Sequence, residues 1–518
     1  MNQGSRPLII AHGGNTAHVP ESTLQSVIAA YTAGADAIWL RVQLSADGVP
    51  VTYAHADLSA TTDGHGAVGS HSASALRALQ CGLRFREAGG TPWKGFAQRR
   101  GGSIPKARIA TLEEVWRRLA REVAWYIELL EPTPEGLAAV ATMAERMGID
   151  ALTWVIDRVD AAATVRAHVP NAALALSADA DPARIGRCLG AGIGTLILPG
   201  GAEAWSLADQ APPELAVLVC CEAEAIPEQH RARGICARSV LRLAHALRGT
   251  RELLRDDFAS EHIDRELWVG GISSGHEVVG SILARRLAEH SLGPGVRPIV
   301  EQIFDDRRSF EARVHQRDGK LRVSIDEGRR YASAGVVSTI TVPDPFQLSV
   351  DFEFSNPQVA NMMVLAVVNG SAFDRFHQEG SVRNPRYWTE HPVFDSHGTP
   401  PFVSVEREEI DGFRIMHNDG NAGLYEWFGN IYEPDVGNGD SRRGKLMLER
   451  RGHLFSGYYQ DELNDDWVGV GFVENPSVRD RAYVRLVSKH YPKEGARDPV
   501  WSNEVSYATF RAITWRRP

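Results

Sequence analysis

The stretch LIIAHGGNTAHVPESTLQSVIAAYTAGADAIWLRVQLSADGVPVTYAH, residues 8–55, sets the fold class of the first half of this chain. Two runs within it, LIIAH at 8–12 and AIWLRVQL at 37–44, have the apolar and β-branched composition of buried strands. Between them, STLQSVIAAYTAGA at 22–35 is rich in alanine and has a helical composition. A strand, a helix and a second strand in this order predict a βαβ unit with two parallel strands in one sheet.

The same alternation continues to about residue 250. Helical or turn sequence separates further β-rich runs at 49–55, 125–131, 152–157, 172–178, 195–200 and 215–221. About eight such units in about 250 residues are typical of a closed (β/α)8 barrel. A doubly wound open sheet is the alternative, but no glycine-rich phosphate-binding fingerprint follows the first strand. We therefore predict an α/β TIM barrel over residues 1–250.

The second half of the chain has a different composition. Residues 1–250 hold 11 of the 41 aromatic residues, and residues 251–518 hold the other 30. Short alternating or apolar runs, such as FQLSVDFEF at 346–354, are separated there by Asp, Asn, Gly and Pro turns. This pattern predicts an all-β antiparallel jelly-roll sandwich over residues 301–518. Residues 251–300 are predicted to connect the two domains and to contain a helix at 281–290.

The composition excludes several classes of protein. With 43% hydrophobic and 23% charged residues, the 518-residue chain is globular rather than disordered. The net charge is −9 and no run of Lys and Arg occurs, so we expect no nucleic-acid partner. The first apolar stretch is only four residues long, which predicts a cytoplasmic protein with no membrane span. The five cysteines lack metal-ligand spacing and are interpreted as buried thiols.

Several motifs in the first 250 residues resemble the glycerophosphodiester phosphodiesterase family. They are IIAHGG at 9–14, PESTLQS at 20–26, GADAIWLRVQLSADGVPV at 34–51, TTDGHG at 61–66, IPKARIATLEEVW at 104–116 and YIELLEP at 126–132. The resemblance implies the same (β/α)8 barrel that the strand pattern predicts. It also implies a site with His-Arg after the first strand, Glu-x-Asp on the second, a His-Asp pair shortly after and Glu-x-Lys on the next strand. In that family the two histidines act as acid and base, and the carboxylates hold a divalent cation.

This sequence departs from the family pattern at most of those positions. The corresponding segments read His12-Gly13, Trp39-Leu40-Arg41, Ala54-His55 and Glu128-Leu129-Leu130. A hard cation needs several oxygen ligands, which Glu128 alone cannot supply. An arginine in place of a carboxylate would also repel the cation. We therefore predict that the barrel holds no metal or other cofactor and lacks ordinary metal-dependent phosphodiesterase activity.

The remaining polar and aromatic residues at the predicted carboxyl ends of the strands suggest a rebuilt pocket. The candidate catalytic residues are His12, Glu128 and His55, and the candidate ligand-binding residues in the barrel are Trp39, Arg41, Tyr53 and Trp154. Because alternate residues on a strand share a face, we expect the Arg41 guanidinium to pair with Glu128 and replace the lost cation. Structural roles are the alternatives: His12 as a hydrogen-bond donor in a turn, Trp39 as a plug in the vacated cavity, and His55 as an exposed loop residue.

The second half resembles the concanavalin A-like lectin and glucanase sandwiches, chiefly in GKLMLERRGHLFSGYYQDELNDDWVGVG at 444–471. Such a domain implies sugar binding, and aromatic rings in loop-like sequence suit the apolar face of a sugar. The candidate residues are Trp388, Tyr425 and Trp427, with sandwich core as the alternative for any single ring. The acidic turn DELNDD at 461–466 is a candidate Ca²⁺ site, with a solvated turn as the alternative.

These observations predict a protein that recognises or processes a carbohydrate or phosphoglycan, with a barrel whose metal site is lost. One alternative is a metal-independent hydrolase that cleaves a glycan or phosphodiester with His12 and carboxylates. The other is a structural protein in which the sandwich mediates oligomerisation. The predicted partner is a carbohydrate or phosphosugar ligand.

Overall fold

The computed structural model describes fifteen separate parts of the chain. They are residues 6–82, 85, 96–99, 102–105, 107–264, 266–274, 314–325, 332–354, 361–369, 401–408, 412–418, 441–462, 464–479, 481–490 and 503–515. The chain forms two compact units. The first comprises Met1–Glu87, Pro105–Thr250 and Trp515–Pro518, and the second comprises Ala88–Ile104 and Arg251–Thr514.

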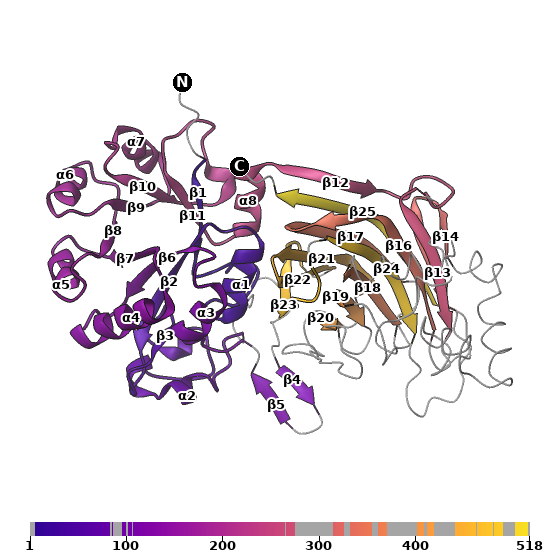
Figure 1. The fold of residues 1–518 in the computed structure, drawn as a ribbon, viewed down its shortest axis with the longest axis horizontal. Coiled ribbons are helices and arrows are strands. Elements are labelled where there is room, and N and C mark those ends of the chain that lie inside the picture. Colours follow the sequence, from indigo (N-terminus) through magenta and orange to yellow (C-terminus); the bar gives the residue numbers. More distant parts are fainter. Residues whose placement is uncertain are drawn as a thin grey trace. The chain divides into compact units, whose positions relative to one another are not determined.

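The first unit is a closed parallel TIM barrel, as predicted (Figure 1). Its strands are β1 Leu8–His12, β2 Ala37–Leu44, β6 Ala124–Leu129, β7 Leu152–Ile156, β8 Ala173–Ser177, β9 Thr195–Pro199, β10 Ala216–Cys220 and β11 Gly234–Ala237. Neighbouring strands pair in the order β1-β11-β10-β9-β8-β7-β6-β2, and β1 also pairs with β2, which closes the sheet.

One predicted barrel strand is wrong and one barrel strand escaped prediction. The run at 49–55 forms only the short strand β3, Pro50–Thr52, which is antiparallel to β2 and lies outside the closed ring. The eighth barrel strand is β11, whose four residues GICA were not recognised as a strand. All four are buried, but so short a run carries no periodicity that could identify it.

Helices follow the barrel strands and cover the sheet (Figure 1). They are α1 Leu24–Thr32, α2 Ala73–Leu76, α3 Leu112–Leu119, α4 Pro134–Met147, α5 Ala161–His168, α6 Ala183–Gly190, α7 Ala202–Gln210 and α8 Val240–Arg248, with 3-10 turns η1 Leu58–Ala60, η2 Val68–Ser70 and η3 Ala223–Ala225. Hydroxyl side chains cap several helix starts: Thr23, Thr111, Thr133 and Ser239 each accept a backbone N–H bond. Among the described residues, no helix combines the length and apolar character needed to cross a membrane.

The interior of the barrel is packed with the alternate, inward-facing side chains of its strands. They are Ile10, Ala37, Trp39, Tyr126, Val155, Ala175, Ile197, Leu218 and Cys236. The barrel is therefore filled below its mouth, and any site must lie at the carboxyl ends of the strands and in the loops that follow them.

The second unit is built from antiparallel sheets. One sheet has the order β14-β15-β25-β17-β21-β22-β23, with β12 also paired to β25, and the other has the order β13-β16-β24-β18-β19-β20. The strands are β12 Thr250–Asp256, β13 Trp268–Ser274, β14 Val314–Arg317, β15 Lys320–Ile325, β16 Ala332–Pro343, β17 Phe346–Phe354, β18 Asn361–Asn369, β19 Phe402–Glu408, β20 Gly412–Asn418, β21 Arg443–Arg451, β22 Leu454–Asp461, β23 Val468–Glu474, β24 Arg481–His490 and β25 Asn503–Trp515. A separate two-stranded pair is formed by β4 Phe96–Arg99 and β5 Gly102–Pro105.

Two features of the second unit bear on the predictions. Strands β12 and β13, at the start of the predicted connecting region 251–300, pair within its sheets. The expected helix at 281–290 lies outside the described residues. Aromatic rings pack between the two sheets: Phe413 of β20 stacks on Tyr459 of β22 at 4.0 Å between ring centroids. Core packing therefore accounts for part of the aromatic excess in this half of the chain.

Candidate functional site

Two neighbouring barrel strands bring the central polar residues together. Arg41 of β2 lies opposite Glu128 of β6 in the parallel register, and Trp39 lies opposite Tyr126. His12 is the last residue of β1 and lies opposite Trp39 on the other side of β2. Because alternate side chains face the same way, Trp39 and Arg41 both point inward at the carboxyl ends of the strands.

A single carboxylate oxygen joins Trp39, Arg41 and Glu128. The indole N–H of Trp39 donates to Oε2 of Glu128 at 3.2 Å, and Nε of Arg41 donates to the same oxygen at 3.1 Å. The side chain of Arg41 is 37% exposed and that of Glu128 is 17% exposed. The expected pairing of Arg41 with Glu128 is therefore confirmed. It places a guanidinium and an indole N–H beside the same carboxylate oxygen.

The imidazole of His12 stacks on Trp39, with 4.2 Å between ring centroids and 15° between the ring planes. Burial lowers the pKa of His12 to about 4, and the positive charge of Arg41 acts on it in the same direction. The ring is consequently neutral near pH 7. In that state one ring nitrogen can accept a proton from a ligand. The protonated imidazolium, which would be needed to act as an acid, is a minor species near pH 7.

These residues open into a cavity of about 470 Å³, which we call the central cavity. It is lined by His12, Trp39, Arg41, Asp157, Ser177, Ala178, Asp179, Arg184, Ile197, Leu198, Pro199 and Cys220. Two guanidinium groups and two carboxylates therefore border the same space. Guanidinium groups bind phosphate or carboxylate oxygens, and carboxylates accept hydrogen bonds from hydroxyl groups.

Comparison with known proteins relates part of the first unit to one protein family. Residues 12–168 match the model of the glycerophosphoryl diester phosphodiesterase family. The first unit contains a domain of this family. The match begins at His12 and includes every residue of the Trp39, Arg41 and Glu128 arrangement.

The curated relatives align with less than a third of this chain. An uncharacterized protein of Mycobacterium tuberculosis is 35% identical over 151 residues, which are 29% of this chain and 47% of the relative. A glycerophosphodiester phosphodiesterase of Bacillus subtilis is 35% identical over 127 residues, which are 24% of this chain and 41% of the relative. The chain thus spans less than half the length of these relatives.

Solved structures align with just under half of this chain. A glycerophosphodiester phosphodiesterase from Agrobacterium tumefaciens has 19% identity and a TM-score of 0.37, covering 46% of this chain and 98% of its own. The phosphodiesterase domain of an uncharacterized Mycobacterium tuberculosis protein has 21% identity and a TM-score of 0.35, covering 46% of this chain and 97% of its own.

Two predicted ligand-binding residues of the phosphodiesterase-family domain are buried. Trp154 is buried, and its neighbour Val155 is the residue of β7 that faces the barrel interior, so Trp154 lies on the opposite face of the strand. Tyr53 is fully buried, and its hydroxyl donates to the carbonyl of Leu58 at 2.9 Å. Neither residue lines the central cavity. Tyr53 was placed at the carboxyl end of a barrel strand predicted over 49–55, but the observed strand β3 ends at Thr52.

His55 contacts Glu21 and does not line the central cavity. Its Nε2 contacts Oε1 of Glu21, and both side chains are about one-third exposed, at 38% and 32%. Gln43 holds the His55 backbone by donating from Nε2 to its carbonyl at 2.8 Å. Of the two histidines, His12 lines the central cavity and His55 does not. They therefore do not face each other across this cavity as an acid and base pair.

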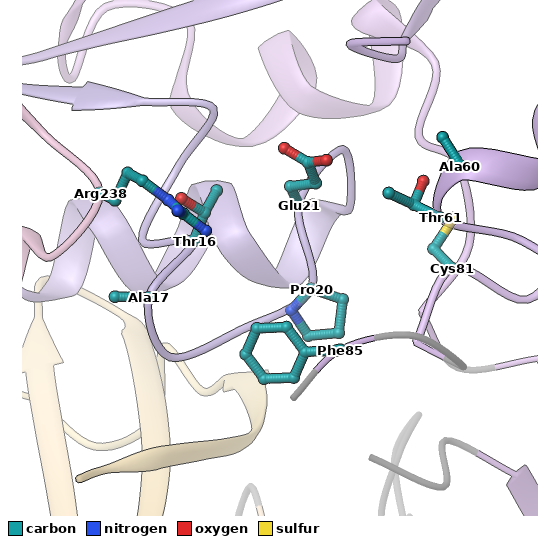
Figure 2. A pocket seen from close by; sticks show the side chains of 9 residues that line it. All are labelled: Thr16, Ala17, Pro20, Glu21, Ala60, Thr61, Cys81, Phe85 and Arg238. Atoms are coloured by element: carbon teal, nitrogen blue, oxygen red, sulfur yellow. The ribbon is translucent and has the colours of Figure 1, made fainter. Parts of the chain in front are cut away.

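Glu21 lines a second space of about 340 Å³, which we call the side cavity (Figure 2). Its lining residues are Thr16, Ala17, Pro20, Glu21, Ala60, Thr61, Cys81, Phe85 and Arg238. The sequence prediction missed Glu21 and Arg238 here, and Asp157, Asp179 and Arg184 in the central cavity. Asp157 directly follows a barrel strand and Glu21 lies within the PESTLQS motif, which are the signals that could have identified them.

The predicted sugar-binding residues Trp388, Tyr425 and Trp427 lie outside the described residues. Within the acidic turn at 461–466, Asn464 donates to Oδ1 of Asp461, and Asp466 accepts from the backbone N–H of Trp467. These two carboxylates therefore make local turn contacts. In the described parts of the chain, no three His, Cys, Asp or Glu side chains are grouped closely enough to hold a metal ion.

Proposed function

We propose that the phosphodiesterase-family domain binds a phosphate ester of a polyol or sugar in its central cavity without a divalent cation. The contact of Arg41 and Trp39 with one oxygen of Glu128 carries this proposal. In this view the guanidinium of Arg41 supplies the positive charge that the resemblance assigns to a bound cation.

The charge distribution of the central cavity supports a phosphate ester. Arg41 uses Nε for Glu128, and the two terminal NH2 groups of a guanidinium are further donors suited to phosphate oxygens. Arg184 lines the same space. Asp157 and Asp179 would accept hydrogen bonds from the hydroxyl groups of the polyol or sugar.

The geometry around Glu128 also supports independence from a divalent cation. Ca²⁺ takes about six to eight oxygen ligands, and Mg²⁺ requires a near-octahedral set. The side chains that contact Glu128 from β2 are nitrogen donors, and one of them is a cation. A divalent ion beside Glu128 would therefore meet repulsion from Arg41 rather than a second carboxylate.

The test is calorimetric titration with glycerol 3-phosphate and glucose 6-phosphate, in chelator and again with Mg²⁺ or Ca²⁺. We expect equal affinity in both conditions. Arg41→Gln should weaken binding by about tenfold or more, because it removes a charge-assisted contact. Arg117→Gln on the outer face of α3 is the matched control and should have no effect. Binding that requires the added cation would contradict the proposal.

A second candidate function, metal-independent hydrolysis, is favoured by one observation. The imidazole of His12 lines the central cavity and is neutral near pH 7, because burial lowers its pKa to about 4. It could therefore accept a proton from water that attacks a phosphodiester or glycosidic bond. With a chelator present, the rate of hydrolysis of glycerophosphodiesters or glycans should then decrease as the pH is lowered, with an apparent pKa near 4. The variant His12→Asn should show no hydrolysis. Turnover that appears only with added divalent cation would contradict this candidate as well.

For the second unit we propose a jelly-roll sandwich that recognises carbohydrate. Two antiparallel sheets with aromatic rings packed between them support the sandwich, and the likeness of residues 444–471 to lectin sequences supports sugar binding. A glycan array probed with the whole chain is the test. A silent array together with a defined oligomer in light scattering would favour the structural alternative instead.

A further inference from the structure

The side cavity is lined by three segments of the barrel domain, which follow β1, β3 and β11. Thr16, Ala17, Pro20 and Glu21 come from the segment between β1 and α1, and Arg238 directly follows β11. Ala60, Thr61, Cys81 and Phe85 come from the segment after β3. The side cavity and the central cavity share no lining residue.

Hydrogen bonds to the backbone connect and position these loops. The N–H of Ala17 donates to the carbonyl of Arg238 at 3.1 Å, which ties the loop after β1 to the loop after β11. Ser22, next to Glu21, has a φ of 63°, a left-handed conformation that is unfavourable for serine. The hydroxyl of Thr52 donates to the carbonyl of Ser22 at 3.0 Å and stabilises this conformation. The loops that carry Glu21 and Arg238 are thus joined by backbone contacts, with backbone strain beside the acidic residue.

The walls of the side cavity combine one negative charge, one positive charge, hydroxyl groups and apolar surface. Figure 2 shows Glu21 between Arg238 with Thr16 on one side and Thr61 on the other, with the rings of Pro20 and Phe85 together along one edge. Burial raises the pKa of the Cys81 thiol, so this residue forms an uncharged part of the wall.

We propose that the side cavity binds a small neutral polyhydroxy compound, a polyol or a single sugar. Hydroxyl groups can donate to Glu21 and accept from Arg238 at the same time, and the C–H groups between them suit the apolar wall. Because Glu21 and Arg238 carry opposite charges, the pair offers no net charge that would favour an anion or a cation over a neutral ligand. The volume lies near the lower end of the roughly 300–1,000 Å³ typical of ligand pockets, which fits one sugar rather than an oligosaccharide.

His55 acts in this site as a positioning residue. Its Nε2 contacts one oxygen of Glu21, and since an ionised carboxylate only accepts, the imidazole is the donor. The contact fixes the orientation of the carboxylate and leaves its second oxygen to the ligand. This assignment does not depend on phosphate binding in the central cavity, because the two sites use different residues.

The test is saturation-transfer NMR titration of the whole chain with glycerol, myo-inositol and D-glucose. We expect at least one of the three to bind, and Glu21→Gln and Arg238→Gln each to weaken it by about tenfold. The exposed Glu203→Gln on α7 is the matched control and should bind as the wild type does.

The role of His55 has its own readout. His55→Ala should lower the affinity for the polyol several-fold, and His55→Gln should restore most of it, because the glutamine amide can still donate to Glu21. No detectable binding of any of the three compounds would overturn the proposal. Binding that Glu21→Gln leaves unchanged, or displacement by the zwitterion glycine, would also overturn it.

Discussion

At the scale of single residues, Glu128 shows how two neighbours determine what a carboxylate can bind. One of its oxygens accepts from Trp39 at 3.2 Å and from Arg41 at 3.1 Å. Because Arg41 is 37% exposed, the ion pair contributes roughly 1 kcal/mol or less to stability. Its main effect is therefore on the charge of the barrel mouth.

Restoring carboxylates opposite Glu128 should create cation binding. In Trp39→Glu/Arg41→Asp, three carboxylates would meet where one now pairs with a guanidinium, and a divalent cation would relieve their repulsion. Calorimetry should detect Ca²⁺ or Mg²⁺ binding, and at about 100 times Kd the cation should raise the free energy of unfolding by about 3 kcal/mol. Trp39→Gln/Arg41→Asn, the neutral counterpart, should not respond. Equal cation binding by the wild type would contradict this expectation.

His12 should make the barrel less stable in acid. Its pKa is about 4 in the folded protein and 6.5 for a solvent-exposed histidine, so below pH 6.5 the unfolded chain takes up the proton first. The contribution of neutral His12 is fully present above pH 6.5 and declines by about 3 kcal/mol as the pH falls to about 4. The free energy of unfolding of the wild type, measured against His12→Gln, should fall by this amount over that range. Parallel curves for the two proteins would show that the pKa is not lowered.

At the scale of elements, α3 shows which local signals are strong. The sequence TLEEVWRRLAREV predicts a helix over 111–123, and the structure has a helix at Leu112–Leu119. Its start is specified locally by a capping box, in which Thr111 and Glu114 each accept a backbone N–H of the other. The end of α3 has no such local signal. It is set by the sheet, because β6 begins at Ala124 and the chain must turn towards the sheet before that residue. The start of this helix was therefore easier to predict than its end.

Loss of the Thr111 cap should destabilise the barrel measurably. Its hydroxyl accepts from the backbone N–H of Glu114 at 3.1 Å. Thr111→Ala leaves that donor unsatisfied and should lower the free energy of unfolding by about 1 kcal/mol in denaturant titration. Thr111→Ser keeps the hydroxyl and should lose much less. A similar loss in both variants would mean that the methyl group, rather than the cap, stabilises this turn.

At the scale of the whole molecule, closure of the first sheet is complete within the first unit. All eight parallel strands lie between Leu8 and Ala237, and β1 pairs with both β2 and β11. The aromatic-rich second half forms sheets of its own. The difference in composition between the two halves thus corresponds to two separately built cores.

The first 250 residues should therefore fold without the rest. We expect a chain truncated after Thr250 to give a cooperative thermal transition by circular dichroism. A chain truncated after residue 230 lacks β11, leaves the edges of β1 and β10 unpaired, and should not give one. A non-cooperative transition in the longer chain would show that the second unit is needed for the barrel to fold.

Three features could be predicted from the amino-acid sequence alone: the barrel, the antiparallel character of the second half and the pairing of Arg41 with Glu128. The first two follow from local periodicity, because alternation on a strand and the order of strands and helices depend on neighbouring residues. The pairing was inferred from alternation on the strand together with the resemblance to the phosphodiesterase family. Three others required the folded chain: Trp154 faces away from the barrel interior, β11 completes the ring, and His55 turns to Glu21.

The folded chain also brings Glu21 and Arg238 to one cavity from opposite ends of the barrel sequence. Loops have no periodicity from which such a meeting could be predicted. Hydrogen bonds between residues far apart in the chain, such as that from Ala17 to Arg238, determine where the side chains of these loops lie. The barrel is thus encoded by local sequence, whereas the side cavity is created by contacts between its two ends.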